Sequence, residues 1–174
     1  MTETHPAEQQ IWRLAYLHLD PDRESPEWYL LVNEGPVDRV LARDGRILVF
    51  TDPAAADRVI DRFGADLPAD DRDLEEPFFR GHLAQTLYLL TSGEADESRF
   101  IIDTANLLLD LIATTGRPVP EHHGRRLKAL ADHFTFASEP KGFFADSGIA
   151  PDAIVETLLW ATGLVMLHLS EVRP

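Results

Sequence analysis

The chain has 174 residues, of which 30 are Asp or Glu and 16 are Lys or Arg, so its formal net charge at pH 7 is −14. This acidity argues against nucleic acid or an anionic membrane as the partner, because binding to either depends on Lys and Arg. The chain has no cysteine, which excludes disulfides, thiolate metal sites and cysteine nucleophiles. With 44% hydrophobic residues, the chain can form a packed core, and we expect a globular protein.

The beginning of the chain carries no sign of export. Residues 1–10 are polar and contain neither the basic nor the apolar segment of a secretory signal, so we expect a cytoplasmic protein. Near the other end, the uncharged run over residues 157–169 is shorter than the roughly 20 apolar residues that span a bilayer. We therefore expect no membrane span and interpret this run as part of a buried helix.

Four apolar segments in the first third of the chain predict a small antiparallel β-sheet. They are residues 11–19, 28–32, 37–42 and 47–50, and the first of them is also compatible with a helix. The last two flank Asp44-Gly45, a pair that supplies the positive φ angles of a tight hairpin. Asp52 and Pro53 then suit the start of a helix, which we expect to run to Phe63.

An acidic segment follows this region. Residues 65–76 place six acids around the single Arg72: Asp66, Asp70, Asp71, Asp73, Glu75 and Glu76. We interpret the segment as a solvated connector whose like charges repel one another, with a docking surface for a basic partner as the functional alternative. A calcium loop has no support, because the required D-x-D-x-D-G spacing is missing.

From residue 77 onward the apolar residues recur at helical spacing. This pattern predicts four helices, at residues 78–91, 96–115, 120–137 and 151–172. The predicted fold class is α+β, with a small N-terminal antiparallel sheet and one helix (8–64), the acidic connector (65–76) and a C-terminal four-helix region (77–174). Whether the two regions share one core is left open. The last helix is apolar on most faces, which predicts either the centre of a bundle or a homo-oligomer contact.

One stripe of polar side chains on the helix at 96–115 is a candidate ligand site. Asp103, Asn106 and Asp110 share a helix face, and their oxygen atoms could bind a ligand or a hard cation together with His82 or His133 from neighbouring helices. The alternative is that the stripe is the exposed face of a largely buried helix. Because the diagnostic metal-binding spacings of His and Glu are missing, we predict no metal and no cofactor.

A second candidate site is the basic cluster at residues 117–128. Arg125 and Arg126 lie there beside His122 and His123, close to the expected start of a helix, where an anion could bind. The structural alternative, which we favour, is that this cluster pairs with the acidic connector of the same chain or of a second copy.

Two functional hypotheses follow from these patterns. The first is a non-enzymatic protein–protein interaction module, a regulator, adaptor or immunity-type inhibitor whose acidic surface binds a basic partner. The chain contains no Walker A, G-x-S-x-G or G-x-G-x-x-G motif, which favours this hypothesis over an enzyme. The second is a helical-bundle enzyme or a ligand- or metal-binding protein that uses an Asp/Asn/His site.

Overall fold

The first two strands bury apolar side chains on both faces of a sheet. β1 (Ile11–His18) pairs antiparallel with β2 (Trp28–Glu34). Along β1, Trp12 and Leu14 join one hydrophobic core, whereas Ala15 and Leu17 join another. Successive side chains of a strand point to opposite faces, so this alternation requires a layer of structure on each side of the sheet. The computed structural model describes residues 9–92, 98–136 and 142–173.

The predicted hairpin is confirmed. β3 (Arg39–Val40) pairs with β2, and β4 (Ala42–Arg43) turns back into β5 (Arg46–Val49). Asp44 and Gly45 form the turn with φ angles of 53° and 72°. Tyr29 and Phe50 exchange backbone hydrogen bonds of 2.7 and 2.9 Å, which connects the hairpin to β2.

The predicted antiparallel pairing is present in β1–β2–β3 and in β4–β5, and three short parallel strands that were not predicted extend it. β6 (Asp71–Asp73) and β7 (Phe79–His82) run parallel to β1, and β8 (Leu169–Glu171) runs parallel to β5. β6 lies within the predicted connector, which is therefore partly a strand at the edge of the sheet. The prediction of a helix at 78–91 was wrong at its start, where residues 79–82 form β7. The prediction of a helix at 151–172 was wrong at its end, where residues 169–171 form β8. These strands are too short to show a period of their own, and pairing with distant strands decides their conformation.

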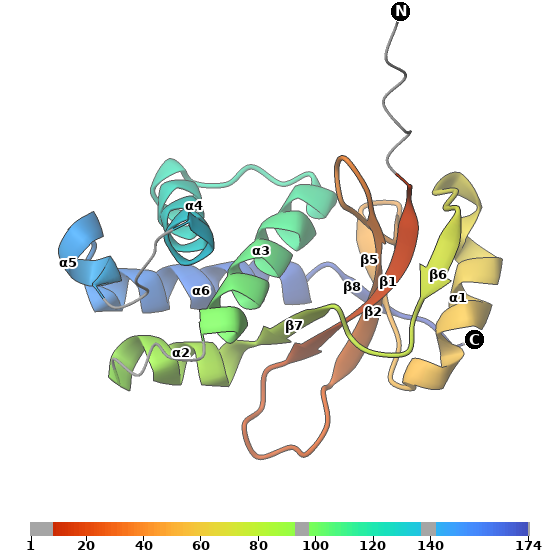
Figure 1. Ribbon diagram of the computed structural model, residues 1–174, viewed down its shortest axis with the longest axis horizontal. Helices are drawn as coiled ribbons and strands as arrows, with labels where there is room; N and C mark the ends of the chain where they lie inside the picture. Colours follow the sequence, from red (N-terminus) through yellow and green to blue (C-terminus); the bar gives the residue numbers. More distant parts are fainter. Residues whose placement is uncertain (1–8, 93–97, 137–141, 174) are drawn as a thin grey trace, which may run out of the picture.

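The helices lie in two separate layers (Figure 1). On one face are a 3₁₀ turn (Pro53–Ala55), α1 (Ala56–Phe63) and a second 3₁₀ turn (Gly64–Asp66). The other layer consists of α2 (Leu83–Ser92), α3 (Ser98–Thr115), α4 (Glu121–Phe136), α5 (Phe143–Ser147) and α6 (Pro151–Met166). The fold class is thus α+β, with the strands mostly in the first half and most helices in the second. Predicted helix residues 96, 97 and 137 lie outside the described residues.

The sheet and the large helical layer share one hydrophobic core. Leu17 and Leu30 of the five-stranded sheet and Ile47 of the three-stranded sheet β4-β5-β8 belong to the same buried cluster as Leu111 of α3 and Leu158 of α6. A second cluster lies under α1, where Val59 and Ile60 pack on Trp12 and Phe50. The two predicted regions therefore contribute to a common core.

The last long helix is buried along one face only. Ile154, Leu158 and Val165 of α6 are enclosed by the helical layer, whereas Leu159 and Met166 keep 52% and 45% of their surface exposed. The helix ends where the backbone N–H of His168 donates to Val165 O. The backbone carbonyl of His168 then accepts from the N–H of Ile47 in β5. None of the helices in the described ranges is long and apolar enough to cross a membrane.

Candidate functional site

The six acidic residues of the connector lie on the surface beside α1. All six are exposed, and α1 adds the exposed Asp57 and Asp61. Figure 1 shows α1 next to β6, in agreement with the ion pairs between them. We call this surface the acidic face; its residues are Asp57, Asp61, Asp66, Asp70, Asp71, Asp73, Glu75 and Glu76.

Two arginines hold the acidic face in place. Arg72 of β6 donates to Asp57 at 2.9 Å and to Asp61 at 2.7 Å, which fixes the strand to α1. Arg13 of β1 pairs with Glu34 at 2.7 Å and also with Asp73. Across the described ranges, Asp66, Glu75 and Glu76 form no ion pair, so the acidic face retains uncompensated negative charge.

Two hollows lie on either side of Arg72. One, of about 320 Å³, is lined by apolar side chains including Trp12 and Ile60 and by the carboxylate of Asp61. The other, of about 330 Å³, has Leu74 in its wall beside Asp57 and Glu75. An apolar wall next to a carboxylate suits a Lys or Arg side chain, whose aliphatic stem packs while its charge pairs.

The basic cluster does not pair with the acidic face. Arg125 lies 3.7 Å from Glu121 and Lys128 lies 2.9 Å from Asp132, both within α4, and Arg126 reaches Glu156 of α6 at 3.1 Å. The prediction that these residues neutralise the connector within one chain was therefore wrong. The reason is that each base has a nearer acid: Arg125 and Lys128 have one four residues away on α4, and Arg126 has Glu156 on the neighbouring α6.

The polar stripe on α3 is mostly covered. Asp103 is buried, with Arg99 Nε 3.6 Å from its Oδ2, and Asn106 and Asp110 are half-buried. Burial raises the pKa of Asp103, and Arg99 opposes this shift. Burial, together with the nearby Asp38, raises the pKa of Asp110 to about 6. The stripe is therefore not simply the exposed face of its helix.

The structure does not bring the two candidate histidines together on this stripe. His82 Nδ1 accepts the backbone N–H of Gln85 at 3.2 Å and so caps the start of α2. Burial and the neighbouring His18, whose ring centroid is 4.2 Å away, lower the pKa of His82. His133 packs instead against Phe134 and Phe143. Within the described part of the chain, no three His, Asp or Glu side chains converge as metal ligands would.

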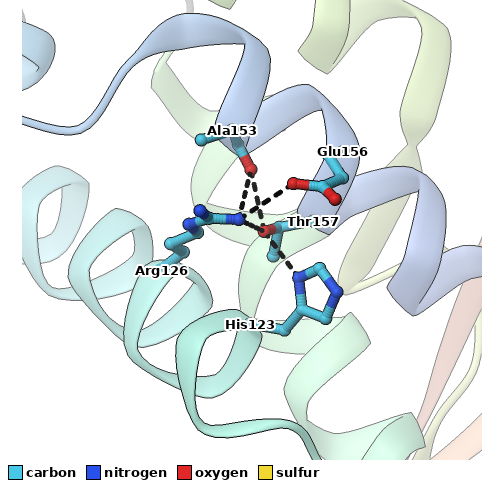
Figure 2. A network of polar contacts seen from close by, with 5 residues as sticks. All are labelled: His123, Arg126, Ala153, Glu156 and Thr157. Atoms are coloured by element: carbon cyan, nitrogen blue, oxygen red, sulfur yellow. Dashed lines mark hydrogen bonds and ion pairs between the residues drawn. The ribbon is translucent and has the colours of Figure 1, made fainter.

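A polar network between α4 and α6 was not predicted (Figure 2). The Thr157 hydroxyl donates its single hydrogen to Ala153 O at 2.8 Å, so its contact of 2.9 Å with His123 Nδ1 makes that nitrogen the donor. Arg126 approaches both Thr157 and Glu156. His123 is buried and stacks on Trp160 with an interplanar angle of 13°. Burial and the adjacent His122 lower the pKa of His123, which favours the neutral ring. The sequence signal was His123 and Arg126 three residues apart on one helix face.

Comparisons of the chain with protein-family models, with curated proteins and with solved structures found no match.

The raised pKa of Asp110 predicts a stabilising substitution. In the folded protein Asp110 keeps its proton up to about pH 6, whereas the unfolded chain loses it near 3.8, so stability falls as the pH rises through this window. Asp110→Asn removes the free-energy cost of burying an ionised carboxylate at this position. Because part of the side chain contacts solvent, we expect a gain of only about 1 kcal/mol at about pH 8. Urea unfolding at several pH values measures this gain, and a gain that persists undiminished at about pH 4 would contradict the assignment.

Proposed function

We propose that the protein is a non-enzymatic protein–protein interaction module that binds a basic partner through its acidic face, as a regulator, adaptor or immunity-type inhibitor does. The observation that carries the proposal is the exposure of all eight acids of the acidic face, which lie on α1, on β6 and in the segments that flank β6. The carboxylates that remain unpaired in the described chain are available to a second molecule.

The shape of the acidic face supports a protein rather than a free cation as the partner. Its two hollows combine apolar walls with carboxylates and are separated by Arg72. Neighbouring cationic side chains of a partner could occupy both hollows, with their stems against Trp12 and Leu74. Like-charged surfaces would be repelled, so the same charges select against acidic proteins.

Long-range attraction gives this arrangement a kinetic advantage. Charges on a surface act over about 10 Å at moderate ionic strength and raise the rate at which an oppositely charged protein associates. Rim charges mainly affect the association rate, whereas the apolar walls of the hollows would limit dissociation. The formal net charge of −14 adds to this long-range attraction.

Neutralising the unpaired acids should abolish partner capture at low salt. The variant Asp66→Asn/Glu75→Gln/Glu76→Gln removes three charges without breaking an ion pair described in the structure. The matched control, Asp22→Asn/Glu24→Gln/Asp146→Asn, removes three exposed charges elsewhere. Capture from native lysate at low and high salt, with the bound proteins identified by mass spectrometry, compares the two variants with the unchanged chain.

The proposal expects a basic protein that the unchanged chain and the control variant retain and the acidic-face variant loses. Equal loss from both variants would show that net charge alone governs binding. Equal retention would show that the acidic face plays no part, and either result would overturn the proposal.

A further inference from the structure

A polar cavity of about 630 Å³ lies where three distant segments meet. The β4–β5 turn contributes Asp44, Gly45 and Arg46. The last residue of α3 and the two that follow contribute Thr115 to Arg117, and the chain after α6 contributes Leu167 and His168. A 2.9 Å hydrogen bond from Ile47 N–H to His168 O holds the hairpin against the last segment. The volume is typical of a small-molecule site.

Arg117 is held at this cavity by a neutral histidine. His168 Nδ1 lies 2.8 Å from Leu164 O, and because a carbonyl only accepts, Nδ1 carries the proton. His168 Nε2 is then free to accept from Arg117 Nε at 3.1 Å. The guanidinium keeps its positive charge, since arginine does not lose its proton in proteins. A neutral partner fixes Arg117 without compensating that charge.

Arg46 brings a second positive charge to the same cavity. It is exposed, and in the described chain it forms no ion pair. Its cross-strand neighbour Arg43 does not line the cavity but lies 3.9 Å from Asp44, which supplies the one carboxylate among the described lining residues. The C-terminal ends of α3 and α6 favour a cation at Arg117 and offset part of the positive potential. Two arginines and one acid among the described lining residues nevertheless make this a cationic site in an acidic protein.

We propose that this cavity binds a small phosphorylated molecule that also carries hydroxyl groups, through Arg46 and Arg117. The free edges of two guanidinium groups match the charge and the acceptor geometry of a phosphate dianion. Asp44 can accept hydrogen bonds from hydroxyl groups on the same ligand. The cavity exceeds the size of a phosphate ion alone, which leaves room for the rest of the molecule. His168 acts as a positioning residue that orients Arg117.

Titration calorimetry with glucose phosphate at constant ionic strength tests this site. Glucose phosphate should bind saturably and more tightly than either inorganic phosphate or free glucose. Arg46→Gln and Arg117→Gln should each weaken binding roughly tenfold or more, because each removes charged hydrogen bonds. The control Arg23→Gln removes the same charge from the exposed β1–β2 loop and should leave binding unchanged.

Thermal unfolding of each variant establishes that the variant folds. The variant His168→Asn is an independent check, because it should weaken binding although both arginines remain. Absence of saturable binding up to about 10 mM, or equal affinities in the Arg46, Arg117 and Arg23 variants, would overturn the proposal. Binding of inorganic phosphate as tight as that of glucose phosphate would also overturn it, because the hydroxyl groups would then contribute nothing. The acidic face takes no part in this test.

Discussion

Replacing Gly81 by alanine is expected to lower the free energy of unfolding by about 2–3 kcal/mol. A Cβ atom at Gly81 would lie 2.9 Å from both Leu107 Cδ2 and the backbone oxygen of Tyr16, and 3.0 Å from Leu17 Cδ2. The Leu107 side chain could shift, but the Tyr16 carbonyl belongs to β1, which pairs with β7. The substitution therefore has to separate β7 from β1 or from α3. Urea unfolding measures the loss.

The matched control is Gly163→Ala on the exposed side of α6. No atom lies within 4 Å of the position a Cβ would take there. Alanine is favoured over glycine inside a helix, so we expect this variant to gain about 0.5–1 kcal/mol. If Gly81→Ala were as well tolerated as Gly163→Ala, the close packing of β7 between β1 and α3 would be wrong.

The second large effect is expected at the contact between α4 and α6. Thr157→Val keeps the shape of the side chain but removes the hydroxyl that accepts from His123 Nδ1. Thr157 is 1% exposed, so the His123 N–H would lose its partner in a buried position. An unsatisfied buried donor costs roughly 1–3 kcal/mol, and the free energy of unfolding should fall by about that amount.

Thr162→Val on the same helix provides the comparison. The Thr162 hydroxyl is buried, and it has no hydrogen-bond partner within the described chain. Replacing it with a methyl group should leave stability unchanged or raise it, because no bond is lost and a polar atom leaves the core. Unfolding titrations that place the two variants within about 0.3 kcal/mol of each other would show that the network does not stabilise the helix contact.

Local chemistry made part of the fold predictable. Asp44-Gly45 predicted the position of the hairpin because both residues tolerate positive φ angles. In the structure both residues have positive φ angles. The start of the first helical segment followed from Asp52, whose side chain accepts from Ala54 N–H, and from Pro53 after it. In both cases a few adjacent residues determine the conformation.

The parallel strands could not be predicted because their cause lies elsewhere in the chain. Residues 79–82 form a strand because Gly81 fits against Tyr16 and Leu107, which are remote in sequence. Residues 169–171 do so because β5 offers backbone partners. The spacing of apolar residues carries no information about either pairing. It led us to include these strand residues in the neighbouring predicted helices.

The candidate sites were predictable to the extent that their residues are adjacent in sequence. The six connector acids could be recognised as a cluster from the sequence. The sequence did not predict that α1 adds Asp57 and Asp61 to this cluster, or that Arg72 bridges α1 and β6. Arg117 was grouped with Arg125 and Arg126 because of sequence proximity. In the fold it contacts His168 instead and lines a cavity with Arg46.

The central claim, that the acidic face attracts a basic protein, is tested most directly by the association rate of the captured partner. Measured between about 50 and 500 mM salt, the rate for the unchanged chain should fall steeply, because screening shortens the reach of the charges. The variant Asp66→Asn/Glu75→Gln/Glu76→Gln should associate more slowly at low salt and with a weaker salt dependence. An association rate that is indifferent to salt, or the same for this variant as for the unchanged chain, would contradict the claim.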